Sequence, residues 1–201
     1  MKSKSNKWLF FVRFIIFFIV VYAVWHFSAS ITNKPFTFIG GNLIMLFDGR
    51  DLTKAVKAVD KRIVVVYEPS TDDKTLTMDY KSFTFNTVFL LALILAVPDI
   101  KYRLRFKILL LGMLILYPEQ IFRMTIYVFN HYCSNMRLRS GAFIYPAYLH
   151  NAIGYIDRVL IRIDGQIVPI IIWASLFYYY KWHNIVKKMW ESKMQLASGA
   201  K

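Results

Sequence analysis

The stretch YPEQIFRM, residues 117–124, interrupts an apolar segment that starts with ILLLGMLIL (108–116) and continues with MTIYVFN (124–130). Glu119 and Arg123 are four residues apart, so a helix places them on one face, in the favourable order of acid before base. A single charge in lipid is costly, and pairing two opposite charges lowers that cost. The stretch therefore predicts a membrane helix with a polar group inside the membrane, made of Pro118, Glu119, Gln120 and Arg123.

This polar group has two interpretations. It is either a site within the membrane for a substrate, a proton or a partner, or a structural ion pair at a contact with another helix. A proton or ion path needs polar groups on several spans, and the second and fourth apolar segments offer almost none, so we favour the structural pair. Pro118 adds a kink to this helix, and a kink frees a backbone carbonyl for a partner.

The composition is typical of a membrane protein. The chain has 201 residues, of which 57% are hydrophobic and 17% aromatic, and its formal net charge is +14. Basic residues beside apolar spans orient a protein and contact anionic lipid headgroups, so the charge does not require a nucleic-acid partner, and we expect none. The single cysteine excludes a disulfide within the chain, and no residue pattern predicts a metal site or a cofactor.

Four apolar segments predict four transmembrane helices, at about 8–27, 83–97, 106–132 and 167–182. The loop between the second and third segments carries four basic residues, Lys101, Arg103, Arg105 and Lys107. Under the positive-inside rule this loop and both chain ends are cytoplasmic, in a multi-pass membrane protein. The N-terminus has the basic start of a signal peptide, but its long aromatic run and weak cleavage site favour an uncleaved anchor.

The predicted fold class is a mainly α-helical membrane protein with a small α+β extramembrane domain between the first and second transmembrane helices. We divide the chain into five parts. These are the cytoplasmic N-terminus and first helix (1–27), the extracytoplasmic α+β domain (28–82), the hairpin of the second and third helices (83–133), an extracytoplasmic amphipathic segment (134–165), and the fourth helix with a basic cytoplasmic tail (166–201).

Two patterns occur within the predicted external domain. Apolar residues recur every three to four positions from Leu43 to Val59, which predicts one or two short amphipathic helices. RIVVVYEP (62–69) and KTLTMDYKSFTF (74–85) predict the two strands of a β-hairpin. Two strands alone are marginally stable, so this ribbon must pack against the helix, the membrane surface or a partner.

The segment after the third span predicts an amphipathic helix over residues 147–163, at the membrane surface or against a partner. Its apolar positions are Leu149, Ile153, Ile156 and Leu160. Three charged residues of this helix, Asp157, Arg158 and Arg162, are interpreted as an interfacial charge cluster that contacts lipid headgroups.

Cys133 leads to a second functional hypothesis, a membrane-embedded thiol enzyme of the transpeptidase or protease kind. A thiolate needs a basic neighbour, and His150 with Arg137 supplies candidates. No glycine or serine motif surrounds Cys133, so a lone interfacial cysteine is the simpler interpretation. A third hypothesis is a subunit of a lipid or small-molecule transporter, which predicts a water-accessible cavity at Glu119.

Three motifs occur in a characteristic order after the first span and the small external domain. They are the basic loop within ALILAVPDIKYRLRFKILLLGMLIL (92–116), YPEQIF (117–122) and IVPIIIWASL (167–176). In this layout the chain resembles the exosortase H-associated membrane proteins.

The resemblance implies a noncatalytic accessory subunit of a bacterial inner-membrane complex for protein sorting or exopolysaccharide export. In that family the sorting chemistry is attributed to a separate exosortase, so no catalytic residue is carried over to this chain. A true exosortase has its cysteine and arginine on separate helices, whereas Cys133, Arg137 and Arg139 are close in sequence. The implied partners are other inner-membrane subunits, bound through the external domain and the kinked third helix.

Overall fold

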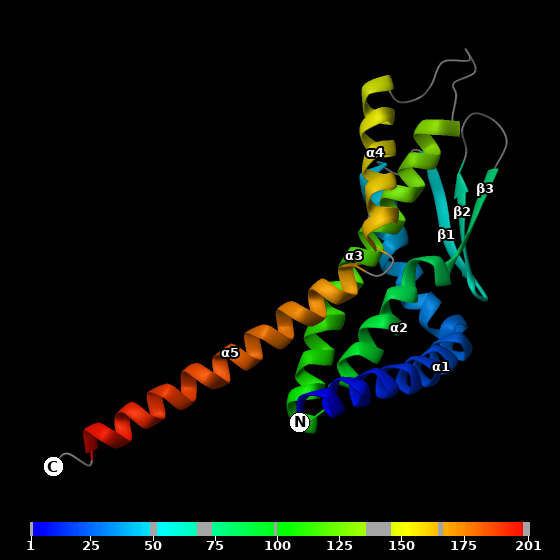
Figure 1. Cartoon of the computed structure of the whole chain (residues 1–201). Helices are drawn as coiled ribbons and strands as arrows, with labels where there is room; N and C mark the ends of the chain where they lie inside the picture. Colours follow the sequence, from blue (N-terminus) through cyan, green and yellow to red (C-terminus); the bar gives the residue numbers. More distant parts are fainter. Residues whose placement is uncertain are drawn as a thin grey trace.

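The computed structural model describes residues 2–48, 52–67, 74–98, 100–135, 146–164 and 167–198, without the side chains of residues 2–7, 135, 162–164 and 183–198. Helices dominate this part of the chain, and a small sheet accompanies them (Figure 1). The elements are α1 (Lys2–Phe47), β1 (Thr53–Val59), β2 (Arg62–Tyr67), β3 (Lys74–Asp79), α2 (Tyr80–Ala96), α3 (Tyr102–Asn135), α4 (Ala147–Asp164) and α5 (Ile167–Ser198).

Two described helices are long and apolar enough to cross a membrane, judged by length and composition. They are the segments Trp8–Phe47 of α1 and Tyr102–Ser134 of α3. α2 is also apolar but has 17 residues, and the side chains of α5 are described up to residue 182. The arrangement of four transmembrane helices therefore stays a prediction.

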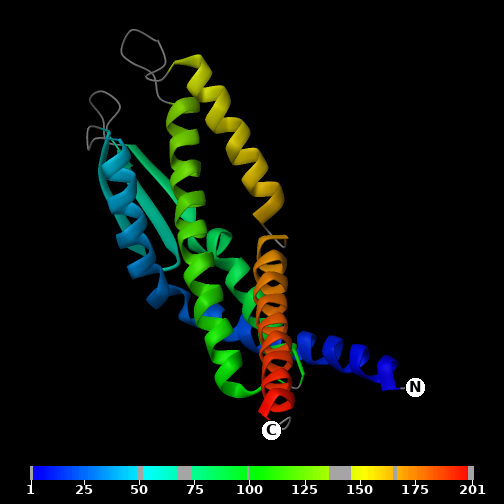
Figure 2. The same ribbon diagram turned by 90° about the vertical axis from the view of Figure 1, so that its left-hand side faces the viewer.

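α1 is much longer than the predicted first span. Its 46 residues correspond to about 69 Å of helix, more than twice the roughly 30 Å of a bilayer core. Pro35 lies inside α1 and has no N–H for the helical hydrogen-bond pattern. Figures 1 and 2 show that α1 bends, so that its second half runs beside the sheet.

Residues 53–59 form strand β1, so the amphipathic helix predicted over this part of Leu43–Val59 is wrong. A register shift between Thr53 and Ala55 interrupts the two-residue alternation of the strand. Because this alternation is broken, the apolar residues of the strand recur at a spacing similar to that of a helix. Asp60 and Lys61 form the turn to β2, and Asp60 has a φ of 52°, which aspartate tolerates in such a turn.

The predicted β-hairpin is confirmed for residues 62–67 and 74–79, whereas residues 80–85, predicted as the end of the second strand, begin α2. β2 and β3 pair antiparallel from Arg62 opposite Asp79 to Tyr67 opposite Lys74, and β1 extends the sheet in the order β1-β2-β3. Asn33 of α1 donates hydrogen bonds to the carbonyls of Asp60 (3.0 Å) and Arg62 (2.8 Å), which attaches the turn between β1 and β2 to the helix. The ribbon thus gains its support from α1, as well as from a third strand.

α2 and α4 lie close to their predicted positions, whereas α5 continues to Ser198, well beyond the end predicted near residue 182. α2 ends at Ala96, two residues before Pro98, and Asp79 caps its start by accepting a hydrogen bond from the amide of Lys81. α4 matches the predicted amphipathic helix over residues 147–163.

Buried apolar side chains form two separate cores. The upper core joins the second half of α1, the sheet, the start of α2 and the end of α3 through Ala29, Phe36, Ile44, Ile63, Val65, Tyr67, Met78, Tyr80, Phe83, Ile121, Met124, Val128 and Tyr132. The lower core joins α2, α3 and α5 through Leu90, Ile94, Ile108, Leu116, Ile172 and Leu176. We call the parts around these cores the upper and lower tiers, as oriented in Figure 1. On α3 the cores meet between Leu116 and Ile121, at the residues PEQ.

Candidate functional site between the two cores

A layer of polar side chains lies where the two cores meet. α2 contributes Thr84, Asn86 and Thr87, and α3 contributes Glu119, Gln120 and Arg123; we call these residues the polar layer. Thr84, Asn86, Gln120 and Arg123 are buried. The expectation that the second span offers almost no polar group is therefore wrong, because α2 supplies three.

Hydrogen bonds connect the polar layer across three helices. Gln120 Nε2 donates to Thr87 Oγ1 at 3.0 Å, which joins α3 to α2. Trp25 Nε1 donates to Thr84 Oγ1 at 3.3 Å, which joins α1 to α2. Buried polar groups are stable when they are hydrogen-bonded in this way, and such bonds also fix how the helices are aligned.

Arg123 contacts α2 and interacts electrostatically with acidic groups on α3 and α4. Its Nη2 donates to the carbonyl of Ser82 at the start of α2, and its guanidinium carbon lies 5.1 Å from the centre of the Phe83 ring. Glu119 on α3 and Asp157 on α4 both interact with it electrostatically. Arg123 is therefore a buried cation shared by α2, α3 and α4.

Glu119 depends on this cation. Both of its carboxylate oxygens are buried and accept no hydrogen bond from the described residues. Arg123, one helical turn away, is the positive group that interacts with it. The structure thus brings Glu119, Gln120 and Arg123 together in one layer, while their neighbour Pro118 is exposed.

Asp157 belongs to the interior rather than to an interfacial charge cluster. It is 5% exposed, and one of its carboxylate oxygens accepts a hydrogen bond from Asn130 Nδ2 at 2.7 Å, across the contact between α4 and α3. Arg158 is exposed, and its Nε donates to the carbonyl of Gly154 at 3.0 Å. The side chain of Arg162 lies outside the described part of the structure.

Cys133 is fully buried near the end of α3. Its neighbour His131 shares a 3.0 Å hydrogen bond with the hydroxyl of Tyr67 on β2. Burial raises the pKa of that hydroxyl above its ordinary value, so Tyr67 stays neutral near pH 7. His150 lies on α4, and Arg137 lies outside the described residues. A buried thiol has no open path to a substrate, so this geometry does not favour the thiol enzyme.

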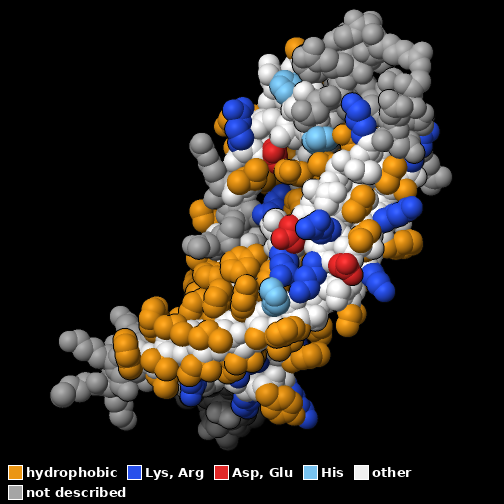
Figure 3. Space-filling view, turned by 90° about the vertical axis from the view of Figure 1, so that its right-hand side faces the viewer, with side chains coloured by type: hydrophobic (Ala, Val, Ile, Leu, Met, Phe, Trp, Pro, Cys, Tyr) orange, Lys and Arg blue, Asp and Glu red, His pale blue; other side chains and the backbone are white. Residues whose placement is uncertain are grey.

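Charged side chains also gather beside the polar layer, on the surface. Figure 3 shows them above a band of hydrophobic side chains along α1. Lys81 Nζ lies 2.9 Å from His26 Nδ1 and 5.9 Å from the centre of the Trp25 ring, and Lys61 interacts with the same histidine. Basic and aromatic groups above an apolar band are typical of the level where a membrane meets water.

Comparison with known protein families assigns the chain to one of them. The family model described as exosortase H-associated membrane protein matches residues 4–178, which include both tiers. The chain belongs to this family. It is therefore an exosortase-associated membrane protein, as the resemblance implied. No curated protein and no solved structure gives a significant match.

In this exosortase H-associated protein, Cys133 is expected to resist alkylation by a membrane-permeant maleimide until the fold is opened, because its side chain is buried. The matched control is Ser134→Cys in a Cys133→Ser background, since Ser134 is exposed one residue further on. Mass spectrometry measures the labelled fraction over time. Equal labelling rates for the two thiols would contradict the burial of Cys133.

Two glycines of this exosortase H-associated protein were not singled out in the sequence and hold the upper tier together. A Cβ atom at Gly41 would lie 2.8 Å from Cβ of Val56 on β1, and one at Gly40 would lie 2.1 Å from the end of the Met124 side chain on α3. α1 therefore approaches the sheet closely at Gly41, whereas at Gly40 the end of the Met124 side chain occupies the space of a Cβ atom. The signal was the Gly-Gly pair itself, because glycine has no Cβ atom and so permits another element to approach the backbone closely.

Proposed function

We propose that this protein is a noncatalytic accessory subunit of a bacterial inner-membrane complex for protein sorting or exopolysaccharide export, and that it binds its partner through the upper tier. The lower tier would anchor it in the membrane. The proposal is supported by membership of the family and by an exposed apolar surface on the upper tier.

The dimensions of the lower tier support a membrane anchor. From Tyr102 to Glu119, α3 extends about 26 Å, close to the roughly 30 Å of a bilayer core. Many side chains of α1 exposed at this level are apolar, including Trp8, Phe11, Ile16, Ile19 and Val20. In this placement the polar layer lies near the outer membrane–water interface, with the basic loop at the cytoplasmic end and the upper tier outside.

The observation that carries the proposal is an apolar stripe on the second half of α1. It consists of exposed side chains, between 48% and 73% accessible, at Ile31, Phe38, Ile39, Leu46 and Phe47. The first half of α1 already has the length needed to cross a bilayer, so lipid does not account for the stripe. An exposed apolar surface of this kind is typical of a protein–protein contact. A helix laid into a groove of the partner would cover it.

The third helix adds a second contact at the boundary between the tiers. Pro118 and Phe122 are both exposed and lie four residues apart, on one face of α3. The polar layer on the opposite side would hold α2, α3 and α4 in register, so that both contact surfaces keep their positions. Glu119, Gln120 and Arg123 then have a structural role in partner binding, and no role in catalysis.

Photo-crosslinking in cells tests this proposal. A photoreactive residue at position 38 is expected to crosslink to exosortase H, because Phe38 is 72% exposed within the apolar stripe. The control is position 155, since Tyr155 is 66% exposed on α4, away from the stripe. Crosslinks at position 38 to lipid alone, or equal protein crosslinks from both positions, would contradict the assignment of the stripe.

A further inference from the structure

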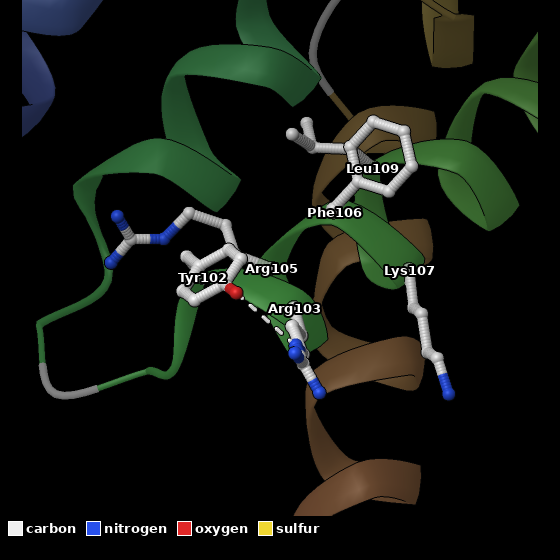
Figure 4. A pocket seen from close by; sticks show the side chains of 6 residues that line it. All are labelled: Tyr102, Arg103, Arg105, Phe106, Lys107 and Leu109. Atoms are coloured by element: carbon white, nitrogen blue, oxygen red, sulfur yellow. Dashed lines mark hydrogen bonds between the residues drawn. The ribbon is translucent and has the colours of Figure 1, made fainter.

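A pocket lies at the start of α3, at the end of the lower tier farthest from the sheet (Figure 4). Its lining combines basic side chains with aromatic and aliphatic ones, and none of them is acidic: Tyr102, Arg103, Arg105, Phe106, Lys107 and Leu109. The surface of the pocket itself is almost entirely apolar, so the charged ends of the basic side chains lie at its rim, an arrangement that suits an amphiphile with a negative head.

Two of the cations each donate a hydrogen bond to a protein group. Arg103 Nε donates to the hydroxyl of Tyr102 at 3.1 Å, and Arg105 Nη2 donates to the carbonyl of Val97 at 2.8 Å. Arg105 Nε is buried and has no hydrogen-bond partner among the described residues. Figure 4 shows the Tyr102 ring between the two arginines, whereas Lys107 extends away from them. Each guanidinium keeps further N–H donors, and phosphate oxygens are suitable acceptors for them.

An apolar track leads from the pocket along α3 towards the upper tier. It consists of side chains four residues apart that are each more than half exposed, at Tyr102, Phe106, Leu110 and Leu114. Side chains at this spacing lie on one face of a helix. The track is about 18 Å long, which is comparable to one leaflet of a bilayer core about 30 Å thick.

We propose that this apolar pocket and the track from Tyr102 to Leu114 hold an acyl chain of an anionic phospholipid, whose phosphate accepts hydrogen bonds from Arg103 at the rim. The short basic loop that precedes α3 is the part expected on the cytoplasmic side, where it faces the headgroups of the inner leaflet. The proposal concerns the membrane anchor and is independent of which protein binds the upper tier.

Lipid retention measured by native mass spectrometry tests the proposal on the full chain. The protein is released from nanodiscs that contain phosphatidylcholine and phosphatidylglycerol in equal amounts, and the lipids that remain bound are counted. The wild type is expected to retain phosphatidylglycerol preferentially. Arg103→Gln is expected to reduce this preference about tenfold, as for the loss of a charge-assisted hydrogen bond. Lys107→Gln, the matched control, is expected to keep it.

Three results would overturn the proposal. One is a preference for phosphatidylglycerol that survives Arg103→Gln and Arg103→Gln/Arg105→Gln. Another is an equal loss in Arg103→Gln and Lys107→Gln, which would indicate a diffuse surface charge. The third is an equal gain in thermal stability from free glycerol 3-phosphate and from phosphatidylglycerol, which would indicate a phosphate site without a role for the acyl chain. Circular dichroism of each variant confirms that it is folded.

Discussion

Replacing Arg123 by methionine is expected to destabilise the folded protein by about 3–5 kcal/mol, the cost of removing one partner from a buried ion pair. Methionine fills much of the same volume, but it donates nothing to the Ser82 carbonyl. It also leaves Glu119 and Asp157 without the cation that interacts with both. The expected loss therefore comes mainly from Glu119, whose buried carboxylate loses its cation and accepts no hydrogen bond from the described residues, and less from Asp157, which keeps its hydrogen bond from Asn130.

A double-variant cycle separates this explanation from a simple loss of packing. Glu119→Gln alone is expected to have a small effect, because Arg123 keeps its hydrogen bond to Ser82 and its electrostatic interaction with Asp157. Arg123→Met/Glu119→Gln is expected to be more stable than Arg123→Met, since one stranded charge is gone. Unfolding in detergent micelles, followed by circular dichroism, gives the four stabilities. Strictly additive effects would contradict the pairing of Glu119 with Arg123.

Replacing Phe36 by alanine is expected to cost about 3–5 kcal/mol as well, as for other large buried aromatic side chains. Phe36 is fully buried in the upper core, and its ring centre lies 5.3 Å from that of Tyr80 and 5.7 Å from that of Tyr117. The residue thus links the second half of α1 to α2 and α3. The same unfolding measurement, with free energies compared at one temperature, checks the prediction.

Phe38→Ala is the matched control, because Phe38 lies two residues further along the same helix but is 72% exposed. Its effect on stability is expected to stay within about 0.5 kcal/mol, while its loss should weaken partner binding. A large destabilisation by Phe38→Ala, or a small one by Phe36→Ala, would mean that α1 packs through a different face.

The fold is predictable from the sequence where one pattern dominates a segment. RIVVVY is dense in β-branched residues, and α4 carries apolar residues at regular helical spacing, so both elements were predicted correctly. The second half of α1 was harder, because Pro35, Gly40 and Gly41 are signals that usually end a helix. In this protein Pro35 accompanies a bend in α1, and Gly40 and Gly41 allow two close contacts. These roles become apparent only when the neighbouring elements are known.

The residues of the candidate site on α3 were predictable from the sequence, but the residues of other helices that interact with them were not. Glu119 and Arg123 are four apart, so their proximity follows from the helix alone. The groups that complete the layer come from distant parts of the sequence: Ser82 and Thr87 from α2, and Asp157 from α4. Tertiary packing brings them together, and the spacing of residues within one segment carries no information about it.

Affinity purification tests the proposed function most directly. The tagged full chain is co-expressed with exosortase H, extracted in mild detergent and purified, and the mass of the eluted complex is measured. We expect exosortase H to co-elute in a fixed ratio with the wild type, and to be lost with Phe38→Ser/Leu46→Ser, which changes the exposed apolar stripe of α1. A wild-type chain that elutes alone as a folded monomer would contradict the account.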